Sequence, residues 1–118
     1  MKITVITAVY NGENTIKKTI ESVLMQEVRP YEYLIVDGLS SDHTVKIAES
    51  YRREFENAGI IYNIVSEKDD GIYDAFNKGV RLAEGEYISF LNADDWYTPT
   101  AVKTVQETYN YQDRKSVV

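Results

Sequence analysis

The feature that most constrains the fold is a regular alternation between two hydrophobic periodicities along the chain. Short runs rich in β-branched and aromatic residues, which are typical of strands, lie at 3–9, 33–36, 60–65 and 87–91. Elsewhere apolar residues recur at three- and four-residue steps, which predicts helices over 14–26, 45–58, 72–82 and from Thr98 onward. Strands that alternate with helices through short loops indicate an α/β domain with an open, doubly wound, mostly parallel sheet. We expect the strand order 3-2-1-4, which is usual for small doubly wound sheets.

The composition indicates one soluble globular domain. The 118 residues are 43% hydrophobic and 27% charged, which suits a compact core and predicts no membrane span. The net charge of −6 argues against generic nucleic-acid binding, because that requires Lys and Arg to neutralise phosphates. The absence of cysteine excludes disulfides, thiolate catalysis and cysteine-ligated metals. Residues 1–10 lack the pattern of a signal peptide, so we expect a cytoplasmic protein.

Two adjacent carboxylates follow the fourth predicted strand. The apolar run, which we expect to be a buried strand, breaks off at Asn92 and is followed by Asp94 and Asp95. Carboxylate oxygens suit Mg²⁺ and Mn²⁺, which complete their coordination with water and substrate phosphates. Alternatively, the two acids are turn residues, since Asp and Asn are favoured in turns for backbone reasons. A metal on His43 is the weaker alternative, because a lone histidine in the first turn after a loop is typically solvated.

Residues at the ends of three predicted strands are expected to surround one crevice. In open parallel sheets, ligands bind beyond the carboxyl ends of the strands, where the strand order reverses. Tyr10, Asp37 and the Asp94–Asp95 pair all lie at such ends. The Tyr10 ring offers a face on which a nucleobase can stack, and Asp37 can accept a hydrogen bond from a base N–H or a ribose hydroxyl. The alternatives are that Tyr10 covers the edge of the core and that Asp37 is a turn residue before Gly38.

Several segments resemble, in their order and spacing, the amino-terminal half of the family 2 glycosyltransferases, which have the GT-A fold. These segments are Ile3–Gly12, Ile35–Thr44, Asn77–Gly79, Gly85–Ile88 and Asn92–Asp95. The resemblance covers nearly all of the chain, and its motifs are specific in combination although each is weak alone. In that family the end of the first strand and the Asp37 position hold the nucleobase, which implies Ala8, Tyr10 and Asp37 as nucleotide-binding residues. Ala8 lies where proline or threonine is frequent, which suggests contact through the backbone.

The resemblance also implies a metal site. The family's Asp-x-Asp position, here 92–95, holds ribose and a metal-bound diphosphate. Asp95 is therefore implied as the ligand of a divalent cation, Mn²⁺ or Mg²⁺, and Asp94 as its partner and a nucleotide-binding residue. Because Asn92 replaces the first aspartate of the motif, a variant of the site with two carboxylates is implied.

The reaction implied by the resemblance is inverting transfer of a sugar from a nucleotide-diphosphate donor, with a UDP-sugar favoured. The acceptor would be a hydroxyl of a saccharide or lipid-linked saccharide, since the run Ser66–Gly79 resembles a bacterial subgroup of surface-polysaccharide assembly. The family's general base comes from the carboxyl-terminal half, so we expect it beyond Val118 and expect residues 1–118 to be the donor-binding half alone. We expect only peripheral membrane contact, at the inner face and through the acceptor. Apolar surface that the absent half would cover should favour self-association.

Two other functions fit parts of the pattern. A non-catalytic nucleotide-sugar-binding or interaction module fits a chain that holds only the donor-binding half. A phospho-receiver domain has similar size and layering, but it needs an acidic pocket at the end of the first strand, where this sequence has Tyr10 and Asn11.

Overall fold

The protein is an α/β domain built on one four-stranded sheet, in a computed structural model that describes residues 1–111, with side-chain surroundings up to residue 107. The strands are β1 Ile3–Val9, β2 Glu32–Asp37, β3 Ile61–Ser66 and β4 Tyr87–Phe90. The helices are α1 Ile16–Leu24, α2 Thr44–Glu49, α3 Arg52–Asn57, α4 Ile72–Leu82 and α5 Ala101–Tyr111. All three strand pairs are parallel and the order is β3-β2-β1-β4, which confirms the predicted open sheet and its 3-2-1-4 order.

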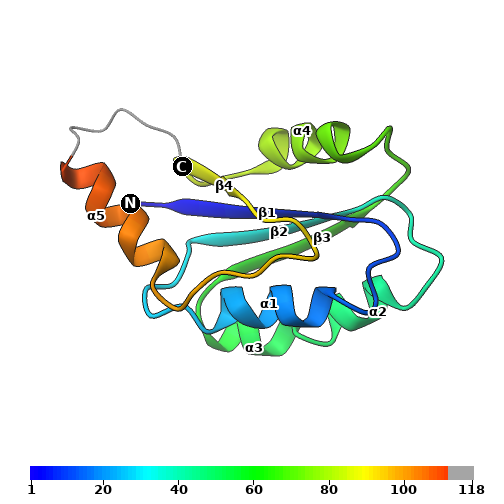
Figure 1. Cartoon of the computed structure of the whole chain (residues 1–118), viewed down its shortest axis with the longest axis horizontal. Coiled ribbons are helices and arrows are strands. Elements are labelled where there is room, and N and C mark those ends of the chain that lie inside the picture. The colour runs from blue at the N-terminus through cyan, green and yellow to red at the C-terminus, as the bar shows by residue number, and fades with distance from the viewer. Residues whose placement is uncertain (112–118) are drawn as a thin grey trace.

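Helices cover both faces of the sheet, so the fold is doubly wound. Figure 1 shows α1, α2 and α3 along one face and α4 along the other. Every residue of β1 and β2 is buried, and their side chains alternate between the two faces. One core cluster packs Val5 and Ile35 against α1, α2 and α3, and a second packs Ile6 and Leu34 against α4. The two central strands are therefore enclosed on both sides.

Buried aromatic rings fill the core between the sheet and the paired helices α2 and α3. Phe55 stacks on Tyr62 with ring centroids 4.3 Å apart, and Tyr33 lies against both rings. The Tyr33 hydroxyl is 2.8 Å from Thr7 Oγ1, and both side chains are fully buried. Burial raises the pKa of Tyr33 above its ordinary value of 10.0, because the charged phenolate would lose its hydration.

The helix boundaries differ from the prediction at two places. The predicted single helix over 45–58 is two short helices, because the chain turns at Ser50, whose Oγ bonds the Ile47 carbonyl and whose amide also bonds that carbonyl. The helix expected from residue 14 begins at Ile16, after a turn in which the Thr15 and Ile16 amides both donate to the Gly12 carbonyl. By contrast, Gly59 closes α3 with φ +74°, the left-handed conformation typical of a helix end.

The expectation that the fourth strand is buried is wrong. The strand β4 has one neighbour, β1, and so lies at the edge of the sheet. Its residues are only partly buried, and Phe90 is 48% exposed although its ring packs on Phe76. Among the described residues, no helix is both long and apolar enough to cross a membrane.

We predict that Tyr33→Phe lowers the free energy of unfolding at pH 7 by about 1 kcal/mol, because Thr7 loses its partner. Since the raised pKa of Tyr33 favours the neutral phenol in the folded state, its stabilisation is complete below pH 10 and is lost as the pH rises above 10. The deficit of the variant should therefore shrink between pH 7 and pH 11, as measured by urea unfolding.

The matched control is Tyr73→Phe, whose side chain is exposed. This variant should match the wild type at both pH values. A Tyr33→Phe deficit that stays constant from pH 7 to pH 11 would contradict the assigned burial effect.

Candidate functional site

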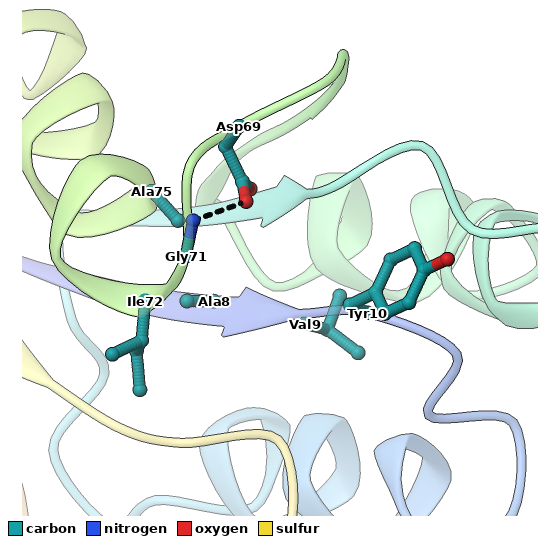
Figure 2. A pocket seen from close by; sticks show the side chains of 7 residues that line it. All are labelled: Ala8, Val9, Tyr10, Asp69, Gly71, Ile72 and Ala75. Atoms are coloured by element: carbon teal, nitrogen blue, oxygen red, sulfur yellow. Dashed lines mark hydrogen bonds between the residues drawn. The ribbon is translucent and has the colours of Figure 1, made fainter.

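A crevice lies at the carboxyl ends of the strands, with Tyr10 at its centre. Tyr10 follows β1 and lines three cavities of about 160, 330 and 340 Å³ that share several residues. Their walls come from the end of β1, the loop before α4, the first turn of α4 and the loop after β4. Figure 2 shows Tyr10 at the end of β1, with Asp69 and Gly71 on the loop before α4 and Ile72 and Ala75 on that helix. The predicted position of the ligand site is where the structure has its crevice.

The segment after β1 is fixed by the loop after β2. Asn11 has the left-handed φ of 49°, its amide donates to Ser40 Oγ at 2.8 Å, and its Oδ1 accepts from the Ser41 amide at 2.9 Å. The Gly12 amide donates to Thr44 Oγ1 at 2.9 Å. These bonds hold the backbone directly after Tyr10, whose side chain is 65% exposed, so an ordered turn presents the ring to solvent.

Asp42 and His43, the only histidine of the chain, also join the segment after β1 to the loop after β2. Asp42 accepts hydrogen bonds from the Glu13 amide and from both the amide and hydroxyl of Thr44. Partial desolvation raises the pKa of Asp42, but these hydrogen bonds outweigh it and hold the pKa below its ordinary value of 3.8. His43 is exposed and pairs with Glu13 at 3.0 Å, so its role in the structure is to join the two loops.

Asp37 lies at the end of β2 but is fully buried beneath the crevice. Its Oδ1 accepts from Ser40 Oγ at 2.5 Å, and its Oδ2 accepts from the Ser40 amide at 2.9 Å and Ser66 Oγ at 2.7 Å. The carboxylate therefore ties the loop after β2 to the end of β3. Its predicted hydrogen bond to a base or ribose stays a prediction, and the cavity walls do not include it.

The loop before α4 supplies wall residues that sequence reasoning did not assign to ligand binding. Lys68, Asp69 and Gly71 line the crevice beside Tyr10. Asp69 lies so close to Gly38 that a Cβ built there would be 2.9 Å from its Oδ2, so the two loops touch. The signal that could have found Asp69 was its place just after β3, since the same rule had selected Tyr10, Asp37 and Asp94.

The acid pair lies in the segment between β4 and α5, which we call the acidic loop (residues 92–99). Both carboxylates are exposed, and neither has a hydrogen-bond or ion-pair partner among the residues that the structure describes. Asp94 lines the same cavity as Ala8 and Tyr10, whereas Asp95 is not part of that wall. The Asp95 amide bonds the Asn92 carbonyl at 3.0 Å, so the acids are also turn residues, as the alternative had it.

These residues suit a cation that is shared with a ligand. Within residues 1–107 no group of three His, Cys, Asp or Glu side chains could hold a metal by itself. Two free carboxylates are the donor set of Mg²⁺ or Mn²⁺ sites that take their remaining ligands from water and phosphate. Lys78 on α4 is already engaged, since its Nζ donates to the Lys68 carbonyl at 2.7 Å and pairs with Glu67 at 3.3 Å. Among the described residues, no Lys or Arg lines the cavity that includes Asp94, whereas Lys68 lines the neighbouring cavity beside Tyr10, so an anion next to the acidic loop needs a positive charge from elsewhere.

The chain is similar to bacterial glycosyltransferases. The model of the family described as Glycosyl transferase family 2 matches residues 4–118. The putative teichuronic acid biosynthesis glycosyltransferase TuaG of Bacillus subtilis is 37% identical over 93 residues, covering 79% of this chain and 36% of its own length. The poly(ribitol-phosphate) beta-glucosyltransferase of Bacillus spizizenii is 33% identical over 98 residues, covering 81% of this chain and 15% of its own. The chain thus spans little more than a third of the length of the first relative and less of the second.

Solved structures share the fold. The S. aureus TarS 1-349 structure in complex with UDP-GlcNAc superimposes with a TM-score of 0.83 at 27% identity, covering 96% of this chain and 32% of that one. The mannosyltransferase PcManGT from Pyrobaculum calidifontis, in complex with GDP-Man and Mn²⁺, gives a TM-score of 0.78 at 24% identity, covering 92% of this chain and 32% of its own. Together with the match over residues 4–118, these findings establish that the chain belongs to glycosyltransferase family 2 and that its sheet has the GT-A fold.

Proposed function

We propose that this chain binds the nucleotide-diphosphate-sugar donor of an inverting glycosyltransferase of bacterial cell-surface polysaccharide biosynthesis. The observation that carries the proposal is the crevice in which Tyr10 and the acidic loop meet at the carboxyl ends of β1 and β4. The relatives named for teichuronic acid and poly(ribitol-phosphate) glycosylation support a surface-polysaccharide role. A UDP-sugar is the favoured donor, since TarS is described in complex with UDP-GlcNAc and with UDP.

In this proposal the nucleoside binds on the Tyr10 side of the crevice. The exposed Tyr10 ring stacks on the base, and the backbone at Ala8 lies along the same wall. Asp37 contributes by holding the loop after β2 in place through Ser40 and Ser66. Because Asp37 is fully buried, its own hydrogen bond to the nucleoside requires the Ser40 hydroxyl to move away from Oδ1. Asp69 is the further polar side chain that faces the bound nucleoside.

The diphosphate binds on the side of the acidic loop, and Asp94 and Asp95 hold the divalent cation there. Mn²⁺ or Mg²⁺ supplies positive charge that stabilises the departing diphosphate when the sugar is transferred. Mn²⁺ is named with the structures of PcManGT and of glucosyl-3-phosphoglycerate synthase from Mycobacterium tuberculosis. The free carboxylates of the acidic loop are the donor set that supports this part of the proposal.

The acceptor, in this proposal, is a saccharide or lipid-linked saccharide. Because the chain spans 36% of TuaG and 15% of the poly(ribitol-phosphate) enzyme, we assign the general base and most acceptor contacts to the remaining length of such proteins. The reaction would take place in the cytoplasm, with contact to the inner face of the membrane only through the acceptor. Self-association through exposed apolar side chains such as Phe90 belongs to the same proposal.

We predict that the chain binds UDP only when Mn²⁺ or Mg²⁺ is present, since a protein of net charge −6 must otherwise face an anionic ligand. Calorimetry of UDP with Mn²⁺ and with chelator is the measurement. Asp95→Asn and Asp94→Asn should weaken Mn²⁺-dependent UDP binding by about 10- to 100-fold. Tyr10→Ala should weaken binding of uridine without phosphates by about 1–3 kcal/mol.

The matched control is Asp70→Asn, which removes one exposed negative charge from the loop before α4 without touching the cavity walls. Its UDP affinity should equal that of the wild type. UDP binding that is equally tight in chelator would remove the cation from the proposal, and equal losses of uridine binding in every variant would contradict the division of roles.

We further predict that residues 1–118 bind the donor yet transfer sugar at a rate about 10²- to 10⁴-fold below that of a protein with the full length of its relatives. The reason is that donor contacts and the general base are assigned to different parts of the fold. The assay is transfer from a labelled UDP-sugar to free and lipid-linked saccharides. Transfer at the full rate by residues 1–118 would place the base within this chain, whereas no transfer by either form would favour the non-catalytic binding module.

A further inference from the structure

A row of polar side chains on α1 and just after it faces the acidic loop. Thr19 and Ser22 lie on α1 and Gln26 lies two residues beyond its end, and their spacing of three and four residues puts them on one side of the helix and of the turn that follows it. Figure 1 shows the segment after β4 leaving the edge of the sheet and passing along the layer of α1 on its way to α5. The acidic loop is therefore next to α1 for most of its length.

Thr19 makes the contact nearest to the acid pair. Its side chain is fully buried, and its Oγ1 lies 2.8 Å from the Ala93 carbonyl and 2.5 Å from the Asp95 carbonyl. These two carbonyls flank Asp94 on either side. A hydroxyl has one proton to donate, so both carbonyls converge on a single donor and the backbone curves around it. The turn that exposes the two carboxylates is thus formed around one side chain of α1.

Further contacts from α1 hold the rest of the loop. The Tyr97 amide donates to Ser22 Oγ at 3.0 Å, and Gln26 Nε2 donates to the Thr98 carbonyl at 2.7 Å. The Lys18 ammonium lies 3.6 Å from the centroid of the Trp96 ring. Attachment to α1 therefore continues along the loop on both sides of Tyr97.

The acid pair depends on this attachment because its own side chains are free. Among the described residues, neither carboxylate has a partner, and β4, which precedes the loop, is a half-exposed edge strand of four residues. Only the backbone of the loop can then fix the direction in which the carboxylates point. A cation site needs that direction to be defined before the ligand arrives, since a loosely held ligand set binds weakly.

We propose that Thr19 is a positioning residue for the cation site, acting through the two carbonyls that flank Asp94. This inference rests on the proposed function, in which Asp94 and Asp95 bind the divalent cation. The residue does not touch the cation or the donor. It sets the turn of the acidic loop, and the cavity beside that loop also includes Thr15 and Gly12 from the turn that begins α1. Through these contacts, α1 fixes the position of the acidic loop, where the cation is proposed to bind, relative to Tyr10.

The test is Thr19→Val, which keeps the β-branched shape but removes the hydroxyl. Its matched control is Thr7→Val, because Thr7 is equally buried and loses its hydrogen bond to Tyr33, while among the described residues it makes no hydrogen bond to the acidic loop. The first readout needs no ligand: hydrogen exchange at the amides of residues 93–97 should speed up in Thr19→Val and stay unchanged in Thr7→Val. The second is calorimetry of Mn²⁺ in the presence of UDP, and of uridine alone.

We expect Thr19→Val to weaken Mn²⁺ binding about tenfold, the lower end of the range for outer-shell partners of metal ligands, and to leave uridine binding unchanged. Thr19→Ser, which restores a hydroxyl, should recover most of the Mn²⁺ affinity. Ser22→Ala, a milder loss at the Tyr97 amide, should shift exchange and Mn²⁺ affinity in the same direction and provides the test if Thr19→Val does not fold.

Wild-type exchange rates and Mn²⁺ affinity in both Thr19→Val and Ser22→Ala would overturn the inference while the proposed function stands. An equal loss of Mn²⁺ affinity in Thr7→Val would also overturn it, because the effect would then follow general stability. If the wild-type chain binds neither Mn²⁺ nor UDP, the proposed function fails and the cation role of Thr19 with it.

Discussion

The parallel pairing of β1 on both of its edges is the constraint on which the rest of the structure depends. Because every residue of β1 is buried, the strand cannot shift without breaking the core on both faces. Val9 pairs with Asp37 in β2, and the Gly38 amide donates to the Val9 carbonyl, so the loops after β1 and β2 leave the sheet at the same level. The crevice exists because these two loops must turn away from the sheet side by side, with Tyr10 on one of them.

The same register explains why the acidic loop needs support from a helix. The strand β4 pairs with β1 only from Ile3 to Ile6, and the Leu91 amide donates to the Ile6 carbonyl as the last of these contacts. The acidic loop therefore leaves the sheet three residues before β1 ends and has no strand beside it at the level of Tyr10. The hydroxyl of Thr19 and the side chains of Ser22 and Gln26 take over where the sheet contacts stop. The pairing with β1 thus sets the position of β4 on the sheet, whereas side chains of α1 and of the turn after it set the position of the acidic loop in the crevice.

Sequence periodicity was sufficient to locate the strands, because burial of β1 and β2 on both faces leaves largely apolar runs. The strand order and the location of the crevice followed from the arrangement that is usual for small doubly wound sheets. Periodicity was insufficient where a polar side chain determines where a helix ends or what a loop contacts. The turn at Ser50 divides an apolar pattern that reads as one helix. Asp37 was recognised by its place at a strand end, but its burial under Ser40 and Ser66 depends on contacts between loops that no local pattern encodes. Thr19 carries a sequence signal, since a threonine occupies a position of α1 that is buried together with Ile16, Ile20 and Val23, but its partner cannot be read from the helix.

The buried carboxylate of Asp37 and the exposed carboxylates of Asp94 and Asp95 differ in what they contact. Asp37 has accepted three hydrogen bonds from the protein and serves to join loops, whereas Asp94 and Asp95 have accepted none among the described residues and are held only through their backbone. The negative charge of the two exposed carboxylates repels an anionic donor until a cation is present. Under the proposed function, cation and diphosphate must therefore bind with positive cooperativity, and linkage requires that each raise the affinity of the other by the same factor. Because neither carboxylate has a basic partner among the described residues, the pair is suited to its task, since a lysine paired with Asp94 would compete with the cation for the oxygens that it needs.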